Sequence, residues 1–206
     1  MTALARPATP ADAAAIAAVH VRAWQAGYRG LLPAALLDAI RLELRERQWH
    51  SRLSGVSGEW VETLVATAPA PSAPDAPAPA PDAPAPAPDA PAPAAPVVGF
   101  LSFAAPSRDP DARIHTAELA ALYVDPARWG SGAADTLLEA LFARLADPYG
   151  RWRELTLWML DGNGRAGAFY ARHGFTPDGA CRTDTLQGPS GLRVPAPHVR
   201  LRLRLR

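Results

Sequence analysis

One segment, residues 118–138, restricts the possible folds of this chain more than any other. An apolar run that is typical of a strand ends at Asp125-Pro126, and a turn of small residues follows at 130–134. We expect a helix to begin there, because apolar residues then recur on one helical face. They are Leu137, Leu138, Leu141 and Leu145. A strand that leads through a glycine-bearing turn into a helix presents unpaired N–H groups and the positive end of the helix dipole. The segment therefore predicts an anion site, suited to a phosphorylated cofactor.

Two well-known nucleotide motifs do not fit this turn, and a plain tight connection is an alternative to a binding site. No Gly-Lys-Ser/Thr follows, and Asp135 stands where a dinucleotide fingerprint has its third glycine or alanine. The pattern instead resembles the acetyl-CoA motif of the GNAT superfamily of N-acetyltransferases, a Val-x-Pro strand end followed by Gln/Arg-x-x-Gly-x-Gly/Ala. Val124 and Pro126 match the first part, and residues 129–134 match the second. Trp129 departs from the family, which has Gln or Arg there.

A second motif lies between residues 163 and 175. Asn163-x-x-Ala followed by Phe169-Tyr-x-x-His-Gly-Phe175 resembles the GNAT pattern of Asn-x-x-Ala before a Phe-Tyr…Gly-Phe helix. The opening of the chain, up to Pro33, is also similar to the start of many bacterial members. The resemblance covers nearly all of the chain except an Ala/Pro tract. It implies an α/β GNAT fold, in which a mixed, mostly antiparallel twisted sheet of six to seven strands carries helices on both faces.

The Ala/Pro tract spans about residues 68–96, and Ala-Pro-Asp-Ala-Pro-Ala-Pro occurs there three times unchanged. Such dense proline excludes helix interiors and ladder hydrogen bonds, so we expect a disordered segment that favours polyproline II. Strand-like runs flank it at 60–66 and 97–103. In GNAT proteins two such strands form a hairpin, so we interpret the tract as an expanded hairpin loop within a single domain, 1–206. Docking of a partner that binds polyproline II and drift of a GC-rich repeat would each explain it.

Other elements are placed from their start and stop signals. Thr9-Pro-Ala-Asp12 predicts a helix start, and Gly30-Leu-Leu-Pro33 predicts a second helix that continues to about Leu53. Its buried face is expected to hold Leu36, Leu37, Ile40 and Leu44. Residues 199–206 alternate arginine with an apolar residue, which predicts a terminal strand. We interpret the arginine row as the solvated face of that strand rather than as a nucleic-acid patch.

Composition argues against several classes of protein. All 21 basic residues are arginine and the net charge is +1, which argues against a dedicated nucleic-acid binder. No apolar run has the length of a membrane span, and the N-terminus does not read as a secretion signal. The single cysteine, Cys181, is interpreted as inert. We therefore expect a cytoplasmic protein with no nucleic-acid or membrane partner. The oligomeric state is left open, a homodimer included.

The GNAT resemblance implies direct transfer of an acetyl group from acetyl-CoA, the expected cosubstrate, to an amine in a ternary complex. The amides of pantetheine would pair with the strand backbone at Leu122, Tyr123 and Val124. Asn163 would hydrogen-bond the pantetheine arm. The residues of the turn would surround the pyrophosphate: Trp129, Gly130, Ser131, Gly132, Ala133 and Ala134.

Two residues are implied in catalysis by the same resemblance. Tyr170 stands where the family has its general acid, and a phenol of pKa about 10 is protonated at pH 7 and suits a departing thiolate. A tyrosine that only packs is the alternative. Glu118, on the strand that ends at Val124, matches a glutamate that some members use as a base, often through a water. The alternative is a carboxylate paired with an arginine such as Arg113.

Trp24 and Tyr28 are expected to wall the acceptor pocket, and ordinary core or surface positions are the alternative. The five histidines show no ligand spacing, so no metal site is expected. The sequence leaves the acceptor open among a protein N-terminus, an aminoglycoside-like antibiotic, a polyamine and an amino acid. A non-catalytic acyl-CoA-binding module is the alternative function, favoured by the absence of Gln or Arg at position 129.

Overall fold

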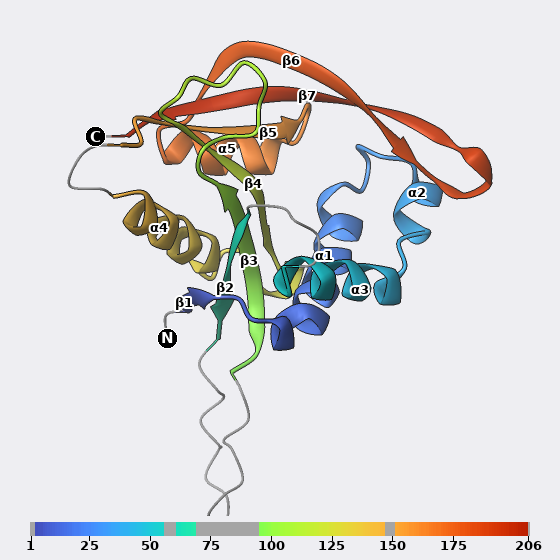
Figure 1. The fold of residues 1–206 in the computed structure, drawn as a ribbon. Coiled ribbons are helices and arrows are strands. Elements are labelled where there is room, and N and C mark those ends of the chain that lie inside the picture. Colours follow the sequence, from blue (N-terminus) through green and yellow to red (C-terminus); the bar gives the residue numbers. More distant parts are fainter. Residues whose placement is uncertain (1–2, 56–60, 69–94, 147–150, 206) are drawn as a thin grey trace, which may run out of the picture.

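A computed structural model describes residues 3–55, 61–68, 95–146 and 151–205 of the chain. Its strands are β1 (Leu4–Pro7), β2 (Glu62–Thr67), β3 (Val97–Ala104), β4 (Thr116–Val124), β5 (Glu154–Leu160), β6 (Thr176–Gln187) and β7 (Arg193–Arg204). These described strands form one sheet of seven, in the order β1-β2-β3-β4-β5-β7-β6 (Figure 1). Neighbouring strands are antiparallel except β4 and β5, which are parallel.

Helices cover both faces of this sheet (Figure 1). They are α1 (Ala13–Gly27), α2 (Ala34–Asp38), α3 (Leu42–Leu53), α4 (Ala133–Leu145) and α5 (Gly164–Arg172). Successive side chains of a strand point to opposite faces. Val65 of β2 accordingly packs in a cluster with α1 and α3, whereas its neighbour Leu64 packs in a cluster with α4 and α5. The predicted α/β fold, a mostly antiparallel sheet with helices on both faces, is confirmed.

Strands β4 and β5 separate partway along their length. They pair only from Thr116 to Leu119 of β4, opposite Glu154 to Leu157 of β5. A bulge lies at the point of separation, because Ala120 is the extra residue of β4 in its register with β3. A bulge bends its strand and increases the local twist. The final residues of β4 therefore pair with β3 alone among the described strands, and an opening forms between β4 and β5.

Strands β6 and β7 form a long hairpin that extends beyond β5 and reaches α2 (Figure 1). Leu36 and Leu37 of α2 pack in one apolar cluster with Val194 and Ala196 of β7. Leu160, at the end of β5, belongs to the same cluster. This contact joins the N-terminal helices to the C-terminal hairpin on one side of the opening.

The prediction of one helix from Gly30 to Leu53 is wrong, because the chain breaks between α2 and α3. Arg41 has an extended backbone (φ −94°, ψ 125°) and is the N-cap of α3. Of the four residues expected on the buried face, Leu44 is 46% exposed. The two helices bury different sides, since α2 packs on the hairpin while α3 packs on α1 through Trp49.

The interpretation of the arginine row in residues 199–206 as a solvated face is wrong for Arg200. Arg200 is 7% exposed. Its Nε donates to Asp178 at 2.8 Å and its Nη1 to Asp111 at 2.7 Å. Arg202 also donates to Asp178, at 2.9 Å. The loop between β3 and β4 folds over this part of β7, and buried charges are stable only when they are paired. The predicted strand itself is present as part of β7.

The Ala/Pro insert, with its predicted disorder, lies outside the described residues except at its two ends. The strands that flank it are antiparallel, with Leu64 of β2 opposite Leu101 of β3. The Ala68 N–H donates to the Pro96 carbonyl at 3.0 Å. The ends of the insert are therefore held side by side at one end of the sheet. The single-domain interpretation of the chain stays a prediction.

Candidate active site

A cavity of about 390 Å³ lies where β4 and β5 separate. This volume falls in the range of about 300–1,000 Å³ that is usual for ligand pockets. Most of the predicted cofactor-binding residues line it: Leu122, Tyr123, Val124, Trp129, Gly130, Gly132, Ala133, Ala134 and Asn163. Ser131 lies in the same turn, is exposed, and is not part of the lining. We call this space the first cavity.

The turn before α4 leaves backbone N–H groups at the first cavity. Gly130 and Gly132 have φ angles of +78° and +83°, a left-handed conformation that would strain any larger residue. Gly132 is the N-cap of α4, and no side chain among the described residues caps this helix. Ala133 and Ala134, in the first turn, line the cavity. The N–H groups of this turn have no intrahelical partner and are suited to an anion.

Trp129, the departure from the GNAT pattern, is held in place and covered by an arginine. Its indole Nε1 donates to the Val124 carbonyl at 3.1 Å. The guanidinium carbon of Arg165 lies 3.3 Å from the centre of the Trp129 ring, within cation–π distance. Both side chains line the first cavity, as do Arg128 and Arg172. The first turn of α5 thus places the positive charge of Arg165 next to Trp129, the position where the GNAT pattern has Gln or Arg.

Helix α5 brings two predicted residues to the first cavity. Asn163 is its N-cap, and the side-chain oxygen accepts the Ala166 N–H at 3.2 Å. Tyr170 is 8% exposed and lines the cavity. Burial raises the pKa of the Tyr170 phenol, and the neighbouring phenol of Tyr123 raises it further. The phenol of Tyr170 is therefore protonated at neutral pH and is available as a hydrogen-bond donor.

A second cavity, of about 210 Å³, adjoins the first. Six residues line both cavities: Tyr28, Leu119, Ala120, Tyr123, Trp158 and Leu160. The predicted acceptor residues Trp24 and Tyr28 line the second cavity, and so does Glu118. The structure therefore brings the predicted catalytic, cofactor and acceptor residues to two neighbouring spaces, with Tyr170 in the first and Glu118 in the second.

Two tyrosines form the wall between the cavities. The phenol oxygens of Tyr28 and Tyr123 are 3.1 Å apart and share a hydrogen bond. Burial raises the pKa of both phenols. The Trp24 ring packs edge-on against Tyr28, with ring centres 5.0 Å apart. The indole Nε1 of Trp24 is buried near the Tyr123 phenol but does not reach hydrogen-bond geometry with any described residue. An unpaired donor therefore lies in the aromatic wall of the second cavity.

Glu118 is buried at the second cavity and accepts three hydrogen bonds from one arginine. Its carboxylate accepts hydrogen bonds from the backbone N–H (3.1 Å), Nε (3.3 Å) and Nη2 (3.0 Å) of Arg108. An arginine partner was the alternative expected from the sequence, but with Arg113 as the example. The structure corrects the residue, because the β3–β4 loop folds back on itself. Its Ser107 N–H donates to the Thr116 carbonyl at 2.8 Å.

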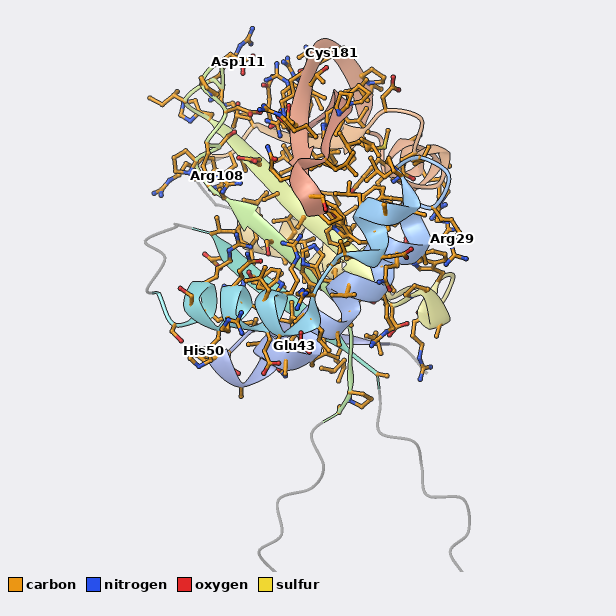
Figure 2. The ribbon with its side chains drawn as sticks, turned by 90° about the vertical axis from the view of Figure 1, so that its right-hand side faces the viewer. Arg29, Glu43, His50, Arg108, Asp111 and Cys181 are labelled. Carbon is orange, nitrogen blue, oxygen red and sulfur yellow. The ribbon has the colours of Figure 1, made fainter. Side chains whose placement is uncertain are left out.

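Sequence analysis missed several polar and aromatic residues of the second cavity: Arg108, Trp158, Arg182 and His198. The indole Nε1 of Trp158 donates to both carboxylate oxygens of Asp109 at 2.9 Å. The guanidinium of Arg182 lies 4.3 Å from the centre of the Trp158 ring. Figure 2 marks the β3–β4 loop by Arg108 and Asp111. These residues come from a loop and three strands, so no local motif connects them in the sequence.

His173 and Cys181 line neither cavity. His173 follows the last turn of α5, and its Nε2 lies 2.9 Å from the Asp135 carboxylate. Cys181 is exposed on β6. Within the described residues, no group of His, Cys, Asp and Glu side chains is arranged to hold a metal ion. None of the helices in the described ranges combines the length and the apolar character needed to cross a membrane.

Residues 94–177 match a family profile described as Acetyltransferase (GNAT) domain. The matched span includes β3, β4, β5, α4 and α5, which supply most of the first cavity. It stops before most of β6 and all of β7, which contribute to the second cavity. No curated protein matches the chain.

Solved structures share the fold over almost the whole chain. PaiA N-acetyltransferase of Thermoplasma acidophilum, in complex with coenzyme A, has a TM-score of 0.66 at 14% identity, with 100% of both chains covered. YncA, a putative acetyltransferase of Salmonella typhimurium with its cofactor acetyl-CoA, has 0.57 at 19%, covering 100% of this chain and 95% of that one. A ribosomal-protein-alanine N-acetyltransferase of Brucella melitensis has 0.56 at 23%, covering 98% and 99%. At these identities the likeness establishes the fold.

Proposed function

We propose, from the premise that this chain is a member of the GNAT superfamily, that it is an acetyl-CoA-dependent N-acetyltransferase. The acetyl group would pass directly to a primary amine of a small molecule or protein in a ternary complex. One observation carries the proposal: the first and second cavities share the walls formed by Tyr28, Tyr123 and Trp158, and Tyr170 lies in the first. A thioester in the first cavity would meet an amine that enters from the second.

The first cavity fits the chemistry of acetyl-CoA, which would supply the thioester and carries the phosphates. The uncapped N-terminus of α4 suits an anion, and Arg128, Arg165 and Arg172 place positive charge around the same space. The end of β4, from Leu122 to Val124, pairs only with β3 among the described strands. Its backbone groups on the β5 side, apart from the Val124 carbonyl that accepts the indole N–H of Trp129, are therefore available for the amides of pantetheine. We assign the pantetheine arm to this edge and the phosphates to the turn.

Tyr170 is the proposed general acid. Its phenol is protonated at neutral pH, because burial raises its pKa. A protonated phenol beside the thioester would stabilise the sulfur as the carbon–sulfur bond breaks, and would then deliver a proton to it. A buried position also excludes water, which strengthens hydrogen bonds in such a site.

Glu118 is the proposed proton acceptor for the attacking amine. Two carboxylate oxygens offer about four lone-pair positions. Arg108 occupies three of them through the hydrogen bonds described above, which fixes the orientation of the carboxylate. The remaining position is available to a water molecule or to the ammonium group of an acceptor. Glu118 would therefore act through a single direction of approach, set by Arg108.

The proposal is tested by two measurements on the purified full chain. Calorimetry with acetyl-CoA should show binding, and incubation of acetyl-CoA with a panel of primary amines should release free coenzyme A together with an acetylated amine, detected by mass spectrometry. Binding without release from any amine would favour the non-catalytic acyl-CoA-binding alternative. Absence of acetyl-CoA binding would contradict both functions.

A further inference from the structure

The second cavity limits the size of the acceptor. Its volume of about 210 Å³ lies below the range of about 300–1,000 Å³ that is usual for pockets of drug-sized ligands. An aminoglycoside could enter only in part. A compact amine, with a body the size of one amino acid, would fill the space.

The two ends of the second cavity differ in chemistry. The residues that it shares with the first cavity are aromatic, aliphatic or small, with the paired phenols of Tyr28 and Tyr123 as their polar groups. All of its charged residues lie among those it does not share: Arg108, Glu118, Arg182 and His198. An acceptor must direct its amine to the shared end to reach the thioester. The opposite end of the same molecule would then face the charged residues.

The charged end is rich in hydrogen-bond donors. The side chains of Arg108 and Arg182 carry only donors. Glu118 is the one acceptor carboxylate in the lining, and Arg108 already satisfies most of its capacity. His198 donates from Nδ1 to the Ala196 carbonyl at 2.8 Å. A ligand group that only accepts hydrogen bonds, such as a carboxylate, complements this end.

Two acidic residues near Arg182, Asp109 and Asp184, already have partners of their own. Asp109 accepts from Trp158 and lies 3.7 Å from Arg182. Asp184 lies 3.3 Å from Arg182 and 3.5 Å from His198. These contacts hold the Arg182 guanidinium at the cavity, and its side chain remains 45% exposed. They do not place a carboxylate in the lining itself, where Glu118 is the only one.

We propose that the acceptor is a free α-amino acid with an apolar side chain of moderate size, bound with its carboxylate toward Arg108 and Arg182. This inference rests on the proposed N-acetyltransferase function. Leu32, Leu160 and Leu186 would contact the side chain. The amine nitrogen forms a bond to the thioester carbonyl carbon, and the carbon–sulfur bond breaks. The sulfur keeps the electron pair and takes a proton from Tyr170, and the proton of the amine passes to Glu118 through a water molecule.

The test compares three acceptors that share the same side chain: leucine, leucinamide and 3-methylbutylamine. Only leucine has a carboxylate. We expect kcat/KM for leucine to exceed that for the other two about 10- to 100-fold, the range for a hydrogen bond to a charged group. The amine of leucinamide is the less basic one and is more often neutral at pH 7.5. A preference for leucine over leucinamide would therefore run against the availability of the neutral amine and reports recognition of the carboxylate.

Variants locate the recognition. Arg182→Gln should raise KM for leucine about 10-fold or more and leave leucinamide unchanged, so that the preference between them falls. Arg193→Gln is the matched control, because Arg193 is exposed on the same hairpin and does not line the cavity. Thermal unfolding of each variant shows whether the fold is retained.

Each outcome bears on the inference separately from the proposed function. Acetylation of 3-methylbutylamine at a rate equal to or above that of leucine would overturn the amino-acid acceptor and leave the acetyltransferase function intact. A preference for leucine that survives Arg182→Gln would overturn this binding mode. No release of coenzyme A with any of the three, while acetyl-CoA binds, would overturn the amino-acid acceptor and favour a binding module.

Discussion

The two cavities of the site are assembled in different ways. The first takes nearly all of its lining from two short stretches of the chain, 119–135 and 157–172, with three residues added from α1 and the position after it. The second takes its lining from α1, two loops, β4, β5, β6 and β7. Two short stretches of sequence can thus specify the first cavity, because a strand, a turn and a helix start are local features. The second cavity depends on how distant segments pack together.

In the first cavity, we expect turnover to depend strongly on a single atom, the hydroxyl oxygen of Tyr170. Replacing Tyr170 by Phe removes only the hydroxyl and keeps the buried ring. We expect kcat to fall about 100- to 10,000-fold, the usual contribution of a general acid. The affinity for acetyl-CoA, measured by calorimetry, should change little. Unchanged turnover in the variant would remove Tyr170 from the mechanism and would leave its burial as a packing role.

The packing of the segments that form the second cavity should instead depend on ion pairs outside it. Arg200 ties β7 to β6 through Asp178 and to the β3–β4 loop through Asp111. Arg200→Met would remove this partner from the buried carboxylates of Asp178 and Asp109, at a cost of about 3 kcal/mol in the free energy of unfolding. Urea unfolding measures it, with Arg204→Met, at an exposed position of the same strand, as the control. Equal stability of the two variants would show that the cluster is not needed for the fold.

The first cavity is built from local segments and the second from distant ones, and this difference explains how well each could be predicted from the sequence. The turn at Gly130 and Gly132 was predicted because small residues between a strand-like run and a helical pattern are a local signal. The structure confirms the strand, turn and helix, and adds the left-handed conformation of both glycines. Tyr170 and Asn163 were located through a family pattern of the same local kind. Their roles in binding and catalysis stay predictions.

The second cavity was predictable only in part. Trp24 and Tyr28 were expected at the acceptor pocket, and both line it. Arg182 was missed because it lies in an exposed, polar strand, where an arginine carries no local signal. The arginine row of β7 was read as solvated for the same reason. Only the fold of the β3–β4 loop brings Asp111 to Arg200 and changes that environment. Tertiary contacts of this kind are not present in any window of the sequence.

His20 allows the core behind both cavities to be tested by pH. Burial lowers the pKa of His20 to about 3, with smaller effects from Arg45 and Arg52. Its Nδ1 accepts the Trp49 Nε1–H at 3.2 Å. The pKa of His20 in the folded state is below its unfolded value of about 6.5. The folding stability is therefore complete above about pH 6.5 and falls as the pH falls toward about 3, because protonation of His20 favours the unfolded state. At pH 5 the loss should reach up to about 2 kcal/mol.

Urea unfolding at pH 7.5 and pH 5 measures this dependence. His20→Gln should keep an acceptor for the Trp49 N–H and should lose less stability between the two pH values than the parent protein. His50→Gln is the control, since His50 is exposed on α3. An equal pH dependence in the parent protein and in His20→Gln would show that the imidazole of His20 can be protonated within the fold without cost.

Arg165 allows a separate test of cofactor binding in the first cavity. Its guanidinium lies over Trp129 at the first cavity, where it would contact a phosphate of acetyl-CoA. Arg165→Gln should raise KM for acetyl-CoA about 10-fold, near the lower end for a hydrogen bond to a charged group, and leave kcat unchanged. Calorimetry with pantetheine, which has no phosphate, should show no difference between the variant and the parent. An equal loss for pantetheine would place the effect of Arg165 on the shape of the cavity instead.

The smallest effect is expected outside both cavities, in the Ala/Pro insert. The strands that flank it pair through their own contacts, with Leu64 opposite Leu101 and Ala68 bonded to Pro96. Deleting residues 73–86 removes two of the three identical repeats and roughly halves the loop, which changes its closure entropy by only about 0.6 kcal/mol. Unfolding by urea and KM for acetyl-CoA should therefore stay close to the parent values. A large loss of stability would show that the repeats contact the folded chain, and a loss of activity alone would assign them to the site after all.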